Sequence, residues 1–308
     1  MSIFATSTSA FFERSTQNLS ALRGQAESLQ NQISSNSKLT KSSDDPLAAS
    51  MLRGLARQEA LGTVDTAAAN RATADLNLTD TALSQFATYI SRAQELATQA
   101  ASSLLPPAQR ASIATELAQI HTGLVGLANT RDSAGHALFG GDSAGNAYQI
   151  NSTSGLAQYI GSGSAGQLSL GDGQSVSRTL TGPDFLNFKD PAGNPTDLMS
   201  VIKNLSDALS SGAASTASTA SAALGSLANG LDAITTAQTV VGSRLNWIDL
   251  STDRQQTMSE ARSSEQADIG TPDLGSALAR LQQLSVVLQA SQASFSKLAN
   301  LSIFDVLR

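Results

Sequence analysis

Apolar side chains recur at alternating steps of three and four residues near the start of the chain, and this periodicity constrains the fold most. The pattern is typical of a coiled-coil seam sustained over three heptads. It ends at a polar stretch, residues 34–43. We therefore expect an amphipathic helix that needs an apolar partner along its length. The seam positions are Phe12, Ser15, Leu19, Leu22, Ala26, Leu29 and Ile33.

The other end of the chain repeats this pattern. Leucine and phenylalanine recur there at intervals of seven, and further leucines widen the stripe. Chain termini are usually polar and frayed, so an apolar stripe at a terminus indicates a surface that some partner covers. The positions are Leu274, Leu278, Leu281, Leu284, Leu288, Phe295 and Leu298, followed by Ile303, Phe304, Val306 and Leu307.

Two further helices are expected after the first seam. Asp45 can cap a helix that starts at Pro46, because proline suits the first helical position and a carboxylate accepts from free backbone N–H groups. Apolar residues at heptad spacing carry this helix to about Ser102, and Pro106–Pro107 ends it. A third helix follows over Ile113–Leu127.

Helical periodicity is lost between Arg131 and Gly182, a stretch that holds 11 of the 23 glycines. The segments 147–150 and 167–170, separated by glycine and serine, are typical of short strands. A short helix over Thr196–Leu209 is expected next. A long seam then runs from Leu224 to Ile248, and Thr271–Pro272 interrupts the chain before the last helix.

These elements predict a mainly α fold, an elongated antiparallel helical bundle or coiled coil with a small β-rich insertion at its tip. Three domains are expected. Residues 1–42 and 270–308 form a terminal coiled-coil polymerisation segment, residues 43–130 and 212–269 form the bundle, and residues 131–211 form a Gly-rich outer domain. The terminal helices extend past the bundle as a pair whose apolar face other subunits must cover.

Composition narrows the classes of function. The formal net charge is −6, so the basic stripe typical of nucleic-acid binding is missing. The chain has no cysteine and therefore no disulfide, thiolate metal site or thiol nucleophile. It shows neither a secretory signal pattern nor an apolar run long enough to cross a membrane. We expect no cofactor, no membrane insertion and no nucleic-acid partner.

The residues that could carry catalysis or metal binding have simpler structural interpretations. His121 has Glu116 five residues before it, which is not a metal-binding spacing, and His136 sits in a Gly-rich turn. Each is better explained as a solvated or locally hydrogen-bonded histidine. Asp44 and Asp45 are explained more simply as a helix cap than as a catalytic carboxylate pair. We therefore expect no catalytic residue and no metal ligand.

A dinucleotide-binding pattern, GxGxxG, occurs at residues 161–166. Such a motif should follow a buried strand and open a helix, but here it lies within the Gly/Ser-rich insertion. A flexible turn is the better interpretation. Asp142, Asp172 and Asp184 are too scattered for a calcium loop.

Heptads in the inner helices are expected to form an intramolecular core. For the terminal helices we favour burial between subunits, and we predict that Leu288→Asp abolishes assembly while the bundle stays folded. The predicted subunit-interface residues are Phe12, Leu19, Leu22, Leu29, Ile33, Leu274, Leu278, Leu281, Leu288, Phe295, Leu298, Ile303, Phe304 and Leu307.

Four short motifs resemble the bacterial flagellin superfamily, and their order along the chain strengthens the resemblance. They are SSDDPLAAS (42–50), GHALFGG (135–141), VGSRLN (241–246) and LSIFDVL (301–307). The last three are most similar to the hook–filament junction branch, although Ala137 and Val306 stand where tyrosine is usual. The resemblance covers roughly residues 1–140 and 220–308.

This resemblance implies a structural, non-enzymatic subunit of the bacterial flagellum that joins the hook to the filament through its terminal helices. Implied partners are further copies of the chain, the hook-side junction protein, flagellin and an export chaperone. The implied location is extracellular, after export without a cleaved signal peptide. A filament flagellin remains an alternative. A surface adhesion module is a second alternative, for which the insertion offers only Tyr148, Tyr159, Phe185 and Phe188.

Overall fold

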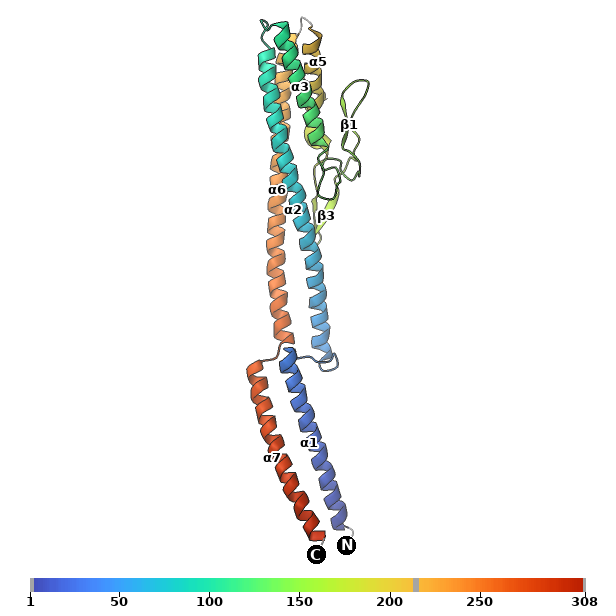
Figure 1. Cartoon of the computed structure of the whole chain (residues 1–308), viewed down its shortest axis with the longest axis vertical. Helices are drawn as coiled ribbons and strands as arrows, with labels where there is room; N and C mark the ends of the chain where they lie inside the picture. The colour runs from blue at the N-terminus through green and yellow to red at the C-terminus, as the bar shows by residue number, and fades with distance from the viewer. Residues whose placement is uncertain (1–2, 213–215, 307–308) are drawn as a thin grey trace. The chain divides into compact units, whose positions relative to one another are not determined.

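A computed structural model of the chain describes the backbone of residues 3–212 and 216–306, and the side chains of residues 10–212 and 216–297. Long helices dominate it (Figure 1), and the predicted mainly α class with a small β-containing insertion is confirmed. The helices are α1 (Ile3–Ser35), α2 (Pro46–Ala100), α3 (Pro107–Ala128), α4 (Gly182–Leu186), α5 (Leu198–Ser211), α6 (Thr216–Gly270) and α7 (Leu274–Val306).

Contacts divide the chain into two compact units. Residues 61–256 form one, here called the bundle unit. Both ends of the chain, up to residue 60 and from residue 257, form the other, here called the terminal unit. Helices α2 and α6 contribute residues to both units.

The core of the bundle unit lies between α2, α3, α5 and α6 (Figure 1). The heptad positions predicted from the sequence fill it: Leu83 and Ile90 of α2 and Leu117 of α3 are fully buried. In α6 the alternate seam positions Ile234 and Val241 are fully buried too. Alanines occupy many of the remaining core positions, so the helices pack closely with little side-chain bulk between them. The intramolecular core predicted for these helices is confirmed.

Capping explains where α2 begins. Asp45 Oδ1 accepts a hydrogen bond from the backbone N–H of Ala48 at 2.9 Å, which satisfies a free donor of the first turn. Asp44 instead accepts from Thr40 and Lys41 in the preceding loop, and these bonds, that of the Thr40 hydroxyl first, lower the pKa of its carboxyl. The predicted capping role of Asp45 is confirmed.

The insertion consists of small antiparallel hairpins. The strands pair as β1 (Tyr148–Ile150) with β2 (Ala157–Tyr159), β3 (Gln167–Gly171) with β4 (Gln174–Ser177), and β5 (Asn187–Lys189) with β6 (Pro195–Asp197). The turn between β3 and β4 holds Asp172 and Gly173 at positive φ, 50° and 73°, as the Asp-Gly hairpin turn requires. The strands predicted at 147–150 and 167–170 are confirmed. The GxGxxG segment lies between β2 and β3 and opens no helix.

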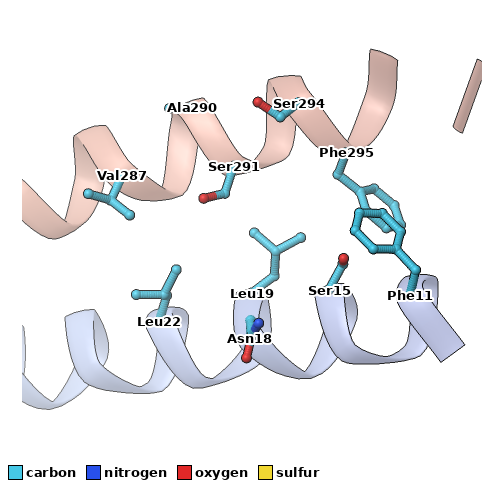
Figure 2. A pocket seen from close by; sticks show the side chains of 10 residues that line it. All are labelled: Phe11, Ser15, Asn18, Leu19, Leu22, Val287, Ala290, Ser291, Ser294 and Phe295. Carbon is cyan, nitrogen blue, oxygen red and sulfur yellow. The ribbon is translucent and has the colours of Figure 1, made fainter. Parts of the chain in front are cut away.

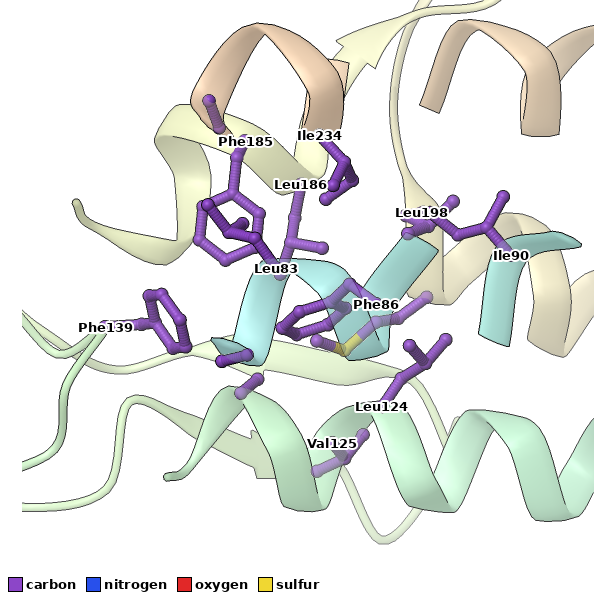
Figure 3. Packing of buried hydrophobic residues seen from close by; sticks show 14 of the residues in the cluster. Leu83, Phe86, Ile90, Leu124, Val125, Phe139, Phe185, Leu186, Leu198 and Ile234 are labelled. Carbon is purple, nitrogen blue, oxygen red and sulfur yellow. The ribbon is translucent and has the colours of Figure 1, made fainter. Parts of the chain in front are cut away.

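An aromatic cluster fixes the insertion to the bundle. The ring centroids of Phe139 and Phe185 lie 4.9 Å apart, and that of Phe86 on α2 lies 5.4 Å from Phe185. All three are fully buried among leucine and isoleucine side chains from α2, α3 and α6 (Figure 3). Phe139 belongs to the GHALFGG motif, where Gly141 has a φ of +64°. A side chain there would collide with Ser162, so the motif requires glycine at that position.

A buried ion network makes a second attachment. Arg178, at the end of the β3–β4 hairpin, donates to Asp75 of α2 at 2.7 Å and also to Asp132. Both carboxylates are buried. Burial alone would raise the pKa of Asp132, but hydrogen bonds from the backbone N–H groups of His136 and Ala134 and the charge of Arg178 outweigh it and lower that pKa.

The prediction for His121 is wrong. Its side chain is neither solvated nor locally hydrogen-bonded: it is 4% exposed on the inner face of α3, and its Nε2 has no hydrogen-bond partner among the described atoms. Burial lowers the pKa of the imidazole, and the nearby Lys203 adds to this effect. Heptad counting selected Leu117 and Leu124 and passed over the position between them on the same helical face.

Candidate assembly surface on the terminal helices

The terminal unit pairs α1 with α7 in opposite directions. Half-buried residues on α1 follow the predicted seam from Phe12 to Ile33. On α7 they recur at Leu281, Leu284, Leu288, Ser291 and Phe295, again in steps of three and four. The rings of Phe12 and Phe295 meet edge to face with centroids 5.3 Å apart. The predicted pairing of the two terminal helices is therefore seen within one chain.

This pair covers its own seam only in part, because two helices leave each seam residue open on its flanks. Phe12, Leu19, Leu22, Leu29, Ile33, Leu281, Leu288 and Phe295 are half-buried, whereas Leu274 and Leu278 are exposed. Leu298, Ile303 and Phe304 have no described side chain, and Leu307 lies outside the described residues. That all these residues contact other subunits stays a prediction.

A groove runs along one flank of the pair (Figure 2). Its volume is about 380 Å³. Phe11 and Phe295 lie at one end of it, and Leu22 and Val287 lie toward the other (Figure 2). Among the described residues, none that lines the groove is charged; its walls are Phe11, Ser15, Asn18, Leu19, Leu22, Val287, Ala290, Ser291, Ser294 and Phe295.

A second hollow in the same unit differs in chemistry. It lies where α1 ends and α7 begins, and its lining includes Lys38, Asp268, Asp273 and Arg280. Water can satisfy such a polar hollow. The first groove instead mixes apolar side chains with uncharged polar ones, Ser15, Asn18, Ser291 and Ser294.

Several exposed apolar residues escaped the sequence prediction. Val286 and Val287 of α7 are 64% and 41% exposed, and Phe11 of α1 is 45% exposed. Heptad counting selects the seam and misses residues beside and behind it. One signal could have found them, because α7 carries no charged residue between Leu281 and Ser296.

Hydrogen bonds also tie the other helices of the terminal unit. The backbone N–H of Lys38 donates to the carbonyl of Gly270 at 2.7 Å. On α2, the Glu59 carboxylate accepts from the Ser259 hydroxyl at 2.7 Å and from Arg262 at 3.1 Å. These two bonds, that of Ser259 first, lower the pKa of Glu59. The α2 and α6 segments of this unit are therefore joined by polar contacts, whereas the described side chains of α1 and α7 meet through the rings of Phe12 and Phe295.

Side chains arranged for metal binding are not found within the described part of the chain, where no group of three or more His, Asp or Glu could hold an ion. Within the same ranges, none of the helices combines the length and the apolar character needed to cross a bilayer. Among the hollows of the terminal unit, the groove beside α7 is the one whose described lining carries no charge.

Known proteins are similar to this chain both in sequence and in fold. Residues 7–144 match the bacterial flagellin N-terminal helical region. The flagellar hook-associated protein 3 of Escherichia coli strain K12 is 25% identical over 294 residues, covering 89% of this chain and 90% of that protein. The protein of the same name from Salmonella typhimurium strain LT2 is 33% identical over 135 residues, 44% of this chain and 43% of its own length.

Solved structures agree on the fold. A putative flagellar hook-associated protein from Vibrio parahaemolyticus superposes with a TM-score of 0.67 at 20% identity, covering 74% of this chain and 100% of that chain. FlgL from Xanthomonas campestris superposes with a TM-score of 0.62 at 20% identity, covering 69% and 99%.

The predicted resemblance to the flagellin superfamily is confirmed by the match of residues 7–144 to the flagellin N-terminal helical region. The chain is also similar to flagellar hook-associated protein 3, along nearly the whole length of both proteins.

Proposed function

We propose that this chain is a structural subunit of the bacterial flagellum that joins the hook to the filament. The observation that carries this proposal is the match to flagellar hook-associated protein 3, which spans 89% of the chain. A match to the flagellin helical region alone, residues 7–144, would fit a filament subunit equally well.

The terminal pair supplies the means of assembly. Its seam is half-covered and its flank carries an uncharged groove, so contact with further subunits removes apolar surface from water. On this basis residues 1–42 and 270–308 act as the polymerisation segment. In this proposal residues 43–130 and 212–269 act as the bundle domain, which includes the parts of α2 and α6 that belong to the terminal unit by contacts, and residues 131–211 act as the outer domain.

The neighbours in the flagellum follow from the adaptor role. One face of the subunit meets the hook-side junction protein and the other meets flagellin, while an export chaperone holds the chain before assembly. The assembled protein is extracellular and acts mechanically, without catalysis.

Electron microscopy of cells lacking the gene tests the role. Intact hooks without filaments, with flagellin shed into the medium, are expected. Intact hooks and junctions with a missing or altered filament would instead mean a filament flagellin. Normal flagella would contradict both and favour a surface adhesion role.

A further inference from the structure

Helix α3 carries a histidine on its core face, where the neighbouring side chains are apolar. His121 is 4% exposed, and Leu117, Leu124 and Val125 on the same face are buried as well. The Nε2 atom of His121 has no hydrogen-bond partner among the described atoms. A buried polar atom without a partner costs free energy that an apolar side chain at this position would not.

Helix α5 packs chiefly against α3 (Figure 1). The Ser206 hydroxyl of α5 donates to the backbone carbonyl of Ala114 at 2.8 Å. The apolar face of α5 is buried: Leu198, Met199, Ile202, Leu205 and Leu209. Helices shorter than about 12–15 residues are marginal in water on their own, and α5 has 14 residues. Helix α5 therefore keeps its structure through this packing.

The charged groups close to His121 are engaged elsewhere. Burial lowers the pKa of His121, Lys203 lowers it further, and Asp197 and Asp207 act in the opposite direction without reversing the shift. Lys203 Nζ donates to the Asp207 carboxylate at 2.6 Å. Asp197 caps α5 by accepting from the backbone N–H of Ser200 at 2.9 Å. A protonated His121 would thus be a buried charge without a counter-ion of its own.

The other elements around α3 do not supply that counter-ion either. On α2, Arg92 donates to Glu116 of α3 at 2.6 Å and to Glu95 at 2.8 Å, so these groups are paired with one another. Strand β1 contributes Tyr148, and burial raises the pKa of its hydroxyl, which stays neutral in acid. Residues 216–231 of α6 are uncharged. The fold therefore tolerates His121 in its neutral form only.

We propose that α5 is an acid-sensitive attachment: when His121 takes up a proton, α5 separates from α3 and unfolds, while α2 and α6 stay helical. Separation brings the imidazolium into water and exposes the apolar face of α5. Helices α2 and α6 have 55 residues each, and Leu83 and Val241 are buried where they pack together. The inference goes beyond the flagellar role, because it concerns the response of one helix to acid.

Hydrogen exchange of the full-length chain, read by mass spectrometry of peptides, tests the proposal. Exchange is measured between about pH 7.5 and about pH 5.5, and each rate is divided by that of the same peptide unfolded at the same pH. Peptides of α5 should be less protected than the α2 segment from Leu76 to Ala97, because α5 opens locally. Protection of α5 should fall about tenfold across this range, since the open form takes up a proton near the ordinary pKa of about 6.5.

Substitution of each of the two histidines in turn supplies the controls. His121→Leu cannot titrate, so α5 should stay protected in acid. His136→Leu is the matched control, because the side chain of His136 is 52% exposed and lies in the insertion, and this variant should keep the tenfold fall. Circular dichroism verifies that the variants keep the helical content of the parent chain. His121→Gln, which cannot titrate either, takes the place of His121→Leu if leucine alters the fold.

Three results would overturn the proposal. The first is α5 protection that does not fall in acid. The second is a fall that persists in both His121→Leu and His121→Gln, which would assign it to other groups. The third is α5 protection as strong as that of α2 at every pH, which would mean that α5 opens only when the whole bundle unfolds. All three leave the flagellar role standing, because that role is tested separately in cells lacking the gene.

Discussion

The bundle unit and the terminal unit use the same heptad pattern and reach different states of burial. In the bundle, Leu83, Ile90 and Val241 are fully buried, because several helices and the insertion close around them. In the terminal pair, Leu281 and Leu288 stay half-buried, because two helices enclose no volume. A heptad seam thus specifies which faces meet, and the number of helices that meet decides how completely they are covered.

Polar anchoring separates the two units as well. In the bundle, Arg178 bonds to the buried carboxylates of Asp75 and Asp132, which helps to fix the position of the hairpin. Between the described side chains of α1 and α7, by contrast, the contacts are mainly apolar or small. A pair of this kind can exchange partners at low cost, which suits a surface that assembles.

The largest effect is expected from the aromatic cluster. Phe86→Ala removes a fully buried ring and should lower the free energy of unfolding by about 3–5 kcal/mol. Urea denaturation followed by circular dichroism measures it. Leu104→Ala is the matched control, since Leu104 is 91% exposed and its loss should change stability by less than about 0.5 kcal/mol. Equal losses of unfolding free energy for the two variants would mean that the Phe86 ring is not packed in a closed core.

The buried ion network comes next. Arg178→Met leaves Asp75 buried without its cation and should cost about 3 kcal/mol of unfolding free energy. Arg92→Met breaks an exposed pair with Glu95 and Glu116 and should cost much less, because water screens exposed ion pairs. Unfolding of both variants in urea gives the comparison. If Arg178→Met lowers the free energy of unfolding no more than Arg92→Met does, the buried ion network does not stabilise the bundle.

Acid should weaken the bundle through His121. Burial lowers its folded pKa, so the unfolded chain takes up the proton first as the pH falls. The contribution of neutral His121 to the free energy of unfolding is fully present above the ordinary pKa of about 6.5. Below that pH it declines, by at most about 1.4 kcal/mol per pH unit, until the folded pKa is reached. Melting temperatures between pH 7.5 and pH 5.5 (about one unit on each side of that value) measure the decline.

His121→Leu provides the control, because leucine cannot titrate. The variant should lose the slope in this pH range and keep the acid unfolding at lower pH that arises from Asp132 and other carboxylates of lowered pKa. An unchanged slope in the variant would assign the pH dependence to groups other than His121.

The smallest effect on the bundle is expected from the terminal pair. Leu288→Asp places a charge on the seam facing α1 and should loosen that pair, while the unfolding transition of the bundle moves by less than about 0.5 kcal/mol. Hydrogen exchange along α7 should accelerate for Leu288→Asp and stay unchanged for Val286→Asp, whose side chain is 64% exposed. If both variants melt the bundle, the two units are not independent.

Sequence periodicity predicted the helices well because the burial pattern repeats locally. The spacing of Leu83 and Ile90 alone predicts a core-facing side of the helix. Asp45 next to Pro46 predicts the start of α2. Of the β3–β4 hairpin, the sequence predicted only the strand at 167–170, although Asp172 and Gly173 supply a turn typical of a hairpin.

Contacts between distant residues were not predictable in this way. Arg178 and Asp75 are 103 positions apart, and nothing in the local pattern around either residue indicates the other. The burial of His121 depends on where α5 packs. The position of the groove beside α7 depends on which flank of the two-helix pair stays open. The heptad positions show which residues face the partner helix, but they do not show which flank is open.

The attachment of the insertion has a practical consequence. Phe139, Phe185 and Arg178 hold it to the bundle at its base, while the turn between β1 and β2, residues 151–155, consists mostly of exposed polar residues and glycine. Loop lengthening at such a turn costs little chain entropy. Gly155 lies against Lys203 of α5, so a foreign peptide is better grafted at the exposed residues 152–154, where it should leave the helices undisturbed and serve as a label or epitope.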